Sequence, residues 1–271
     1  MLPLWPPLDR PAFIIGCGRS GTTILGTVLA HHPLVTYLNE PRDLWIRVLP
    51  EADVWSAKAA VRGGRLELDA AACRLLARWR FRWRLARAVR RTGRPRLVEK
   101  LPINAFRLPF ILAAVPEARF VHLVRDGRAV ARSIARRCAQ EVWYGVDDYK
   151  FRLLAERAER DPETRALPAR CHTPFERGLL EWRLSEEAAL AFFAAHPDVP
   201  CLDVRYEAFV EAPARELARI ETFLELPPSV EAHALADREV RERHRAPQDL
   251  SPDVEAIGGP LLRRLGYLAE G

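Results

Sequence analysis

The feature that most constrains the fold of this chain is a glycine-rich segment near its start, Gly16 to Thr23, which reads GCGRSGTT. It lies between an apolar run that predicts a strand over residues 11–16 and a pattern that predicts a helix from Ser20 to about His31. Glycines allow a tight turn, and successive N–H groups at a helix start form a nest for an anion. The segment therefore predicts a strand–loop–helix unit that binds a phosphate-like group. A glycine-rich turn without a ligand is the alternative.

The loop departs from the nucleotide P-loop at one position. Gly16 and Gly21 have the spacing of the G-x4-G frame, but Thr22 stands where that loop carries its lysine. Without the lysine, the contact that kinases and NTPases make to the β- and γ-phosphates is missing. Asp126 lies in a basic context and is not a clear ligand for Mg²⁺. The sequence thus indicates a phosphate-binding loop that is not a Walker kinase loop.

Short apolar runs alternate with helical patterns along the chain, which is typical of an α/β domain with a parallel sheet. The predicted fold class is α/β, with a P-loop-like central parallel sheet flanked by helices and carrying helical inserts, in a single domain over residues 1–271. The predicted strands are 11–16, 34–38, 96–99, 119–125 and 201–206. The predicted helices are 20–31, 104–115, 127–138, 175–195 and 215–224, with a helix or turn after Pro41.

Two segments fall outside this alternation and are predicted as inserts. One, at about 50–92, contains an arginine-dense helical stretch from Leu66 to Arg91, in which Trp79 and Trp83 are interleaved with arginines. Such a helix can bind a polyanion or a membrane surface, but a solvated helix whose aromatic face packs on the domain is the more common structure. The other insert, residues 139–174, is a long polar excursion of the kind that often covers a substrate.

Charge and cysteine content narrow the class of protein. The 42 basic residues exceed the 36 acidic ones, which gives a net charge of +6 and favours anionic ligands without indicating nucleic acid. Only Lys58, Lys100 and Lys150 are lysines, so a lysine inside a site is notable. Five scattered cysteines, no signal-peptide pattern and no apolar run of ~20 residues predict a soluble, cytoplasmic protein without a membrane span. No His/Cys cluster has zinc spacing, so no metal is expected.

A second motif adds a family resemblance. Val124 to Ser133 reads VRDGRAVARS, follows a predicted strand and opens a helix. Together with RSGTT in the first loop, it resembles the sulfotransferases that use 3′-phosphoadenosine-5′-phosphosulfate (PAPS). In that family the first loop holds the 5′-phosphosulfate, and an arginine and a serine with the separation of Arg125 and Ser133 grip the 3′-phosphate. Arg125 offers a bidentate fork, and Ser133 lies about two helical turns further on nearly the same face.

A third match is the DVRYE segment at residues 203–207, similar to the family's Tyr-Glu segment, whose tyrosine lies beside the adenine. Tyr206 can equally be a half-buried aromatic residue of the sheet. The resemblance covers about residues 12–43, 97–136 and 201–226, and it implies PAPS as co-substrate. The PAPS-binding residues that it implies are Gly18, Arg19, Ser20, Gly21, Thr22, Thr23, Arg125, Ser133 and Tyr206.

Sulfuryl transfer to a hydroxyl needs a base for the acceptor proton, cations near the reacting oxygens and in-line geometry. Lys100 ends a predicted strand on the binding side of a parallel sheet. It resembles the family lysine that stabilises the leaving phosphosulfate oxygen, and Arg19 is the second implied catalytic cation. Cytosolic small-molecule sulfotransferases carry a histidine two residues after this lysine, where this chain has Pro102, so their arrangement is absent.

The catalytic loops are most similar to those of the protein-tyrosine sulfotransferases. Glu40 follows Arg19 at the separation of their catalytic glutamate, so the resemblance implies Glu40 as the base and places Arg42 opposite an acidic acceptor. Hydrogen bonding and partial desolvation would tune the pKa of Glu40 upward. The alternative is a turn carboxylate paired with Arg42. His31 and His32 are the next candidate bases, although neighbours at a helix end more often cap or pack.

These motifs together indicate a PAPS-dependent sulfotransferase that acts on an acceptor hydroxyl. The acceptor can be a protein tyrosine, a glycan or a small molecule, because residues 50–92 and 139–174 show no pattern that selects one. The oligomeric state is not indicated. Two other functions stay open: a P-loop kinase-like phosphotransferase, against which Thr22 argues, and a non-catalytic nucleotide- or polyanion-binding protein, against which Glu40 and Lys100 argue.

Overall fold

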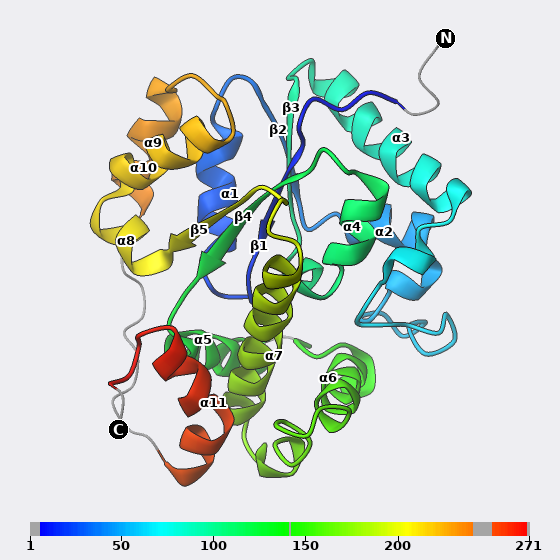
Figure 1. Cartoon of the computed structure of the whole chain (residues 1–271), viewed down its shortest axis with the longest axis vertical. Helices are drawn as coiled ribbons and strands as arrows, with labels where there is room; N and C mark the ends of the chain where they lie inside the picture. Colours follow the sequence, from blue (N-terminus) through cyan, green and yellow to red (C-terminus); the bar gives the residue numbers. More distant parts are fainter. Residues whose placement is uncertain (1–5, 141, 241–250, 270–271) are drawn as a thin grey trace.

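The computed structural model describes residues 6–140, 142–240 and 251–269. Its centre is a parallel sheet of five strands in the order β2–β3–β1–β4–β5 (Figure 1). The strands are β1 (Ala12–Ile15), β2 (Val35–Asn39), β3 (Arg96–Lys100), β4 (Arg119–Val124) and β5 (Cys201–Arg205). They differ from the predicted strands only at their ends, and the α/β prediction with a central parallel sheet is confirmed.

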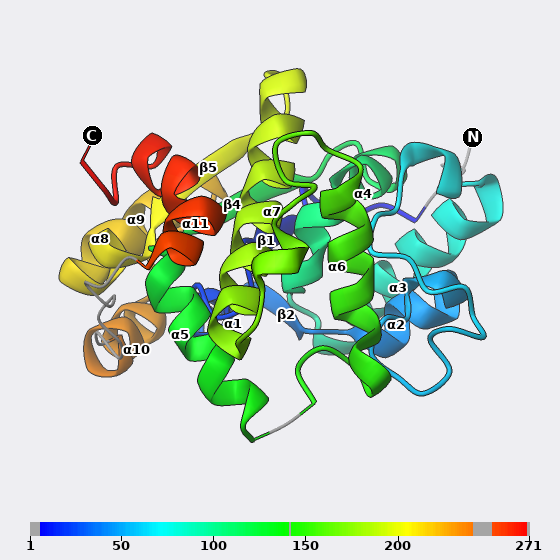
Figure 2. The same ribbon diagram turned by 90° about the horizontal axis from the view of Figure 1, so that it is seen from below.

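Helices cover both faces of the sheet (Figure 1). One face carries α1 (Thr22–Ala30), α8 (Tyr206–Glu211), α9 (Pro213–Phe223) and α10 (Val230–Glu239). The other face carries α2 (Arg42–Val48), α3 (Leu75–Thr92), α4 (Leu108–Ala114) and part of α7 (Pro174–Ala195). Below the carboxyl ends of the strands lie α5 (Gly127–Cys138), α6 (Tyr149–Glu159), α11 (Pro252–Arg264) and the first half of α7, as Figure 2 shows from that side.

Alternate residues of β1 enter two separate cores. Ala12 and Ile14 pack with α1, α9 and α10, whereas Phe13 and Ile15 pack with α2, α4 and α7 on the opposite face. All four side chains are fully buried. A parallel strand covered on both faces needs a continuous apolar run, and that is what residues 12–15 supply.

The two inserts differ from their predictions. The arginine-dense helix begins at Leu75, because residues 66–74 form a loop with a short 3₁₀ turn at Ala70–Ala72. Its aromatic residues divide between two environments: Phe81 packs with its ring centroid 4.7 Å from that of Trp45, whereas Trp79 is 44% exposed. The prediction that the aromatic face packs on the domain is therefore right for Phe81 and wrong for Trp79. Residues 139–174 contain α6, a helix that the sequence pattern did not predict.

Helix ends explain the other differences. The helix predicted over residues 104–115 is a 3₁₀ turn at Pro102–Phe106 followed by α4, in which Pro109 occupies the first turn, where its missing N–H costs no hydrogen bond. Tyr206, predicted to end a strand, is the first residue of α8. No helix among the described residues is long and apolar enough to cross a membrane.

Candidate active site

The glycine-rich loop is held against β4 and α8 by close backbone approaches. Gly16 has φ 133°, and a Cβ there would lie 2.4 Å from the carbonyl oxygen of Leu123. Gly21 is the N-cap of α1 with φ 100°, and a Cβ on it would lie 2.4 Å from the ring of Tyr206. Both positions combine a left-handed backbone with a lack of space for a side chain. The loop therefore has this shape because both residues are glycine.

A cavity of about 470 Å³ opens beside the start of α1. Its lining brings together most of the residues predicted to bind PAPS, from β1–α1, β4–α5 and α8. Those residues are Arg19, Gly21, Thr22, Thr23, Arg125, Ser133 and Tyr206. Two others lie elsewhere: Gly18 lines a second pocket, and Ser20 is fully buried in the loop.

The two arginines of this cavity are connected to each other. Arg19 Nε donates to Ser133 Oγ at 3.1 Å, and Arg125 donates to the backbone oxygen of Arg19 at 3.1 Å. The Arg125 guanidinium lies 3.9 Å from the ring centroid of Tyr206. Trp182 Nε1 donates to the backbone oxygen of Arg125 at 3.1 Å, which fixes the end of β4. The glycine-rich loop and the segment after β4, which lie far apart in the sequence, thus form one positively charged side of the cavity.

Glu40 and Lys100 meet at the carboxyl ends of neighbouring strands. Asn39 pairs with Lys100 in the parallel ladder, and the N–H of Glu40 donates to the Lys100 carbonyl at 2.7 Å. Lys100 Nζ donates to Glu40 Oε1 at 2.8 Å and to Thr23 Oγ1 at 2.9 Å, and its side chain is fully buried. Arg42 donates to the other carboxylate oxygen of Glu40 at 3.0 Å.

The pKa of Glu40 differs from the expectation. Burial raises the pKa of this carboxyl, but the Lys100 ammonium and the Arg42 guanidinium outweigh burial, and the net effect lowers it. The expected upward tuning is therefore wrong for this state of the protein, because two cations contact the carboxylate. Burial lowers the pKa of Lys100, and Glu40 opposes that effect.

A second, small pocket of about 50 Å³ is lined by Glu40, the carboxylate that Lys100 contacts. It has Glu40 and Arg42 at one side, and the Arg42 guanidinium lies 4.5 Å from the ring centroid of Trp55. Trp143 covers Gly18 so closely that a Cβ there would be 2.9 Å from the ring. The pocket is also lined by Leu101, Pro102, Ile103, Phe106, Lys150, Glu181 and Ser185.

Several of these lining residues were missed by sequence reasoning. Trp143 Nε1 donates to Glu181 at 2.8 Å, and Lys150 forms a buried ion pair with the same carboxylate. The one available signal was that Trp55, Trp143 and Lys150 lie in the two predicted inserts. Nothing in the sequence around Glu181, in the middle of α7, distinguishes it.

The other candidate bases lie outside both cavities. His31 Nδ1 is 2.9 Å from the carbonyl oxygen of Thr27, and His32 Nε2 is 2.8 Å from that of Pro227. Both contacts are of the packing and capping kind expected for neighbours at a helix end. In residues 6–140, 142–240 and 251–269, no group of three or more His, Cys, Asp or Glu side chains is placed to hold a metal ion.

Comparison with known proteins decides the family. The sequence model of the sulfotransferase family matches residues 11–230. The chain belongs to the sulfotransferase family. This confirms the family identified from the loops, and with it the prediction of a PAPS-dependent sulfotransferase at the level of the family.

Curated relatives are similar in sequence, and a solved structure shares the fold. This sulfotransferase is 28% identical over 133 residues to a putative protein-tyrosine sulfotransferase of Caenorhabditis elegans, covering 49% of this chain and 41% of the relative. It is 23% identical over 281 residues to protein-tyrosine sulfotransferase A of the same organism, covering 94% and 66%. The sulfotransferase domain from the curacin biosynthetic pathway matches with a TM-score of 0.61 at 17% identity, over 97% of this chain and 99% of that one. The chain thus spans 41% to 66% of the length of these two curated relatives.

Behind the glycine-rich loop lies a buried histidine that the sequence did not single out. His122, in β4, has Nε2 at 2.8 Å from Glu186 and Nδ1 at 2.9 Å from Asp203. The other oxygen of Glu186 accepts from the N–H of Cys17 at 3.3 Å. Burial lowers the pKa of His122, but the two carboxylates outweigh it and raise the pKa to about 9. This network ties β4 and β5 to α7 and to the loop.

The His122 network predicts a pH dependence of stability. The pKa of His122 is about 9 in the folded protein, against an ordinary value of 6.5 for the unfolded chain. The protonated His122 therefore stabilises the fold fully below about pH 6.5, and this contribution is lost as the pH rises through about 9. The shift of the His122 pKa corresponds to roughly 3 to 4 kcal/mol of unfolding free energy. Urea unfolding of the wild type should therefore show stability falling between pH 6.5 and 9.5. His122→Gln should be less stable at pH 6.5 and show a flatter profile, and an equally steep decline in the variant would contradict this.

Proposed function

We propose that this chain transfers a sulfuryl group from PAPS to an acceptor hydroxyl, with Glu40 as the base and Lys100 and Arg19 stabilising the transferred group. The observation that carries the proposal is the position of Lys100. Its ammonium contacts Thr23, which lines the larger cavity, and Glu40, which lines the smaller one. A donor in the first cavity and an acceptor in the second would meet at this lysine.

The larger cavity supports a donor with two anionic ends. Arg19 and the loop N–H groups at the start of α1 suit the 5′-phosphosulfate, because a helix N-terminus and a guanidinium both favour negative charge. Arg125 and Ser133 suit the 3′-phosphate, and Tyr206 offers a face for the adenine. Both arginines lie within one cavity wall.

The residues present fit such a ligand in one further respect. The Ser20 hydroxyl oxygen is buried and has no hydrogen-bond partner among the described residues. An unpaired buried hydroxyl is unfavourable, and an oxyanion held by the loop would supply the missing acceptor. PAPS, when bound, supplies the sulfuryl group and a bisphosphate leaving group.

The chemical step needs only groups that these residues provide. The acceptor O–H proton passes to the Glu40 carboxylate, the acceptor oxygen forms a bond to sulfur, and the bond from sulfur to the 5′-phosphate oxygen breaks. The bonding electron pair leaves on that phosphate oxygen, which gives adenosine 3′,5′-bisphosphate. Lys100 and Arg19 stabilise the charge that develops there, because their positions are fixed before the reaction.

The proposed acceptor is a broad class, any molecule that presents a hydroxyl group. Relatives named protein-tyrosine sulfotransferases support a protein tyrosine, and a glycan or small molecule would serve the same chemistry. Arg42, half-exposed beside Glu40, supports an acidic acceptor. We infer that residues 139–174 cover the acceptor, since Trp143 and Lys150 line the smaller pocket.

The five free cysteines support a reducing, cytoplasmic location.

Binding of the product tests the donor site. We expect tight binding of adenosine 3′,5′-bisphosphate and weak binding of ATP by isothermal titration calorimetry. Removing one charge-assisted hydrogen-bonding group costs about 1.5 to 3 kcal/mol, so Arg125→Ala should weaken bisphosphate binding by about 10- to 100-fold. Arg132→Ala is the matched control, because Arg132 is exposed on α5, the helix that follows Arg125, and lines neither cavity. Tight ATP binding without bisphosphate binding would instead favour the kinase-like alternative.

A further inference from the structure

Helix α3 presents an exposed face that no part of the proposed reaction uses. At its start, Leu75 is 76% exposed, Leu76 57% and Trp79 44%, whereas Phe81 and Leu85 on the opposite face are fully buried. Large apolar side chains exposed side by side are unusual on a soluble protein and mark an interaction surface. We name the α3 face by its residues, which are Leu75, Leu76, Trp79, Arg80, Trp83 and Arg87.

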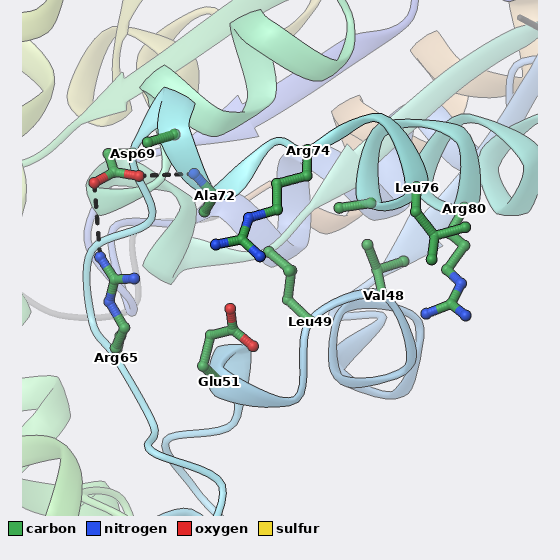
Figure 3. Close-up of a pocket in the computed structure, with 11 residues that line it drawn as sticks. Val48, Leu49, Glu51, Arg65, Asp69, Ala72, Arg74, Leu76 and Arg80 are labelled. Carbon is green, nitrogen blue, oxygen red and sulfur yellow. Dashed lines mark hydrogen bonds and ion pairs between the residues drawn. The ribbon is translucent and has the colours of Figure 1, made fainter.

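Apolar and cationic groups alternate on this face. Trp79 and Trp83 stack with ring centroids 6.2 Å apart, and the Arg87 guanidinium lies 5.2 Å from the Trp83 centroid. Beside the start of the helix is a groove of about 430 Å³. Figure 3 shows Leu76 and Arg80 of α3 next to Val48 of α2 along this groove. Val48 and Leu49 are almost fully buried at this groove, and Glu51 and Asp69 also line it, so the large exposed apolar side chains here belong to α3 itself.

The positive charge of α3 is poorly neutralised within the described part of the chain. The helix contains no acidic residue, and Arg82 pairs with Glu117. Within residues 6–140, 142–240 and 251–269, no ion pair is formed by Arg80, Arg84, Arg87, Arg90 or Arg91. Burial lowers the pKa of Arg84, and the neighbouring Arg47, Arg80 and Arg87 lower it further. Like charges crowded in this way favour an anionic partner.

We propose that the α3 face docks the protein on an anionic lipid bilayer. Both ingredients of interfacial binding are present on one helix: tryptophan and leucine side chains that can enter the headgroup region, and arginines that attract anionic lipid. A soluble polyanion would need the arginines alone and would gain little from exposed Leu75 and Leu76. The apolar residues therefore favour a bilayer over a polyanion.

Vesicle sedimentation of the full chain tests this proposal. We expect binding to vesicles of phosphatidylcholine mixed with phosphatidylglycerol, and little binding to phosphatidylcholine alone. The triple variant Leu75→Ser/Leu76→Ser/Trp79→Ser should weaken binding to the mixed vesicles by about tenfold or more, since three apolar side chains leave the interface. Arg80→Glu/Arg87→Glu should reduce it to the level of phosphatidylcholine alone.

Controls separate docking from folding and from charge alone. Val230→Ser/Arg238→Glu makes the same kinds of change on exposed residues of α10, across the sheet from α3, and should bind as the wild type does. Circular dichroism and thermal unfolding check that the α3 variants are folded. The proposal fails if the wild type does not sediment with phosphatidylglycerol vesicles at low salt. The proposal also fails if the folded triple variant binds the phosphatidylglycerol vesicles as well as the wild type does and heparin displaces both proteins from the vesicles. That result would assign the α3 face to polyanions.

Discussion

Replacing Glu40 by glutamine should lower the rate of sulfuryl transfer from PAPS by about 100- to 10,000-fold, the range that general-base catalysis contributes. Glutamine keeps the size of the side chain and an oxygen that can accept from Lys100, but it cannot take up the acceptor proton. Glu40→Ala should have at least as large an effect. Binding of adenosine 3′,5′-bisphosphate should stay within a few-fold of the wild type, because Glu40 does not line the larger cavity.

The experiment measures kcat with PAPS and titrates the bisphosphate for each variant. Glu187→Gln is a matched control: Glu187 is also a partly exposed carboxylate in an ion pair, with Arg183 Nε 2.7 Å away, but it lines neither cavity. Arg42→Ala addresses the alternative in which Glu40 is only a turn carboxylate. In that alternative, Glu40→Gln and Arg42→Ala change stability by similar amounts and leave kcat intact. Full activity of Glu40→Ala would remove Glu40 as the base.

The sequence predicted the parts of the fold in which local pattern and tertiary environment agree. The strands of the sheet are short apolar runs bounded by loops, and burial on both faces demands just that composition, as Phe13 and Ile15 show. The glycine-rich loop could be placed because Gly16 and Gly21 must adopt positive φ where a side chain has no room. Such requirements act on single residues and are therefore visible in the sequence.

The helices that were missed lack a comparable local signal. α11 contains Gly258, Gly259 and Pro260, which disfavour a helix, yet its buried residues Ile257 and Leu262 hold it in place. α6 begins after Asp147 and Asp148, both with positive φ, in the segment described from its sequence only as a long polar excursion. In both cases packing against the rest of the fold overrides local propensity.

The candidate site was predictable as a set of residues but not as a network. The loops after neighbouring parallel strands lie at the same end of the sheet. The order of the strands therefore explains why one cavity contains Arg19, Arg125 and Ser133. The direction of the Glu40 pKa shift depends on how closely Lys100 and Arg42 approach, and spacing along the chain does not report that distance. For the same reason the Trp143–Glu181 contact had no sequence signal.

Replacing Lys100 by alanine should reduce sulfuryl transfer by about 100- to 1000-fold, the usual cost of removing one fixed group that stabilises developing charge. Lys100→Met, which keeps the volume of this buried side chain, should lose a similar amount, so a packing defect alone would not account for the effect. Lys58→Ala is the matched control, because Lys58 is exposed and lines neither cavity.

The pH profile of Lys100→Met gives a second and independent readout. The Lys100 ammonium is the largest of the charges that lower the pKa of Glu40, so its removal should raise that pKa. Glu40 then has to lose its proton at a higher pH before it can act as a base, and the acidic limb of the kcat profile should move upward. If a group other than Glu40 were the base, the acidic limb would stay where it is, because the charge of Lys100 acts on the pKa of Glu40. An unmoved limb in a folded, bisphosphate-binding Lys100→Met protein would therefore argue against Glu40 as the base.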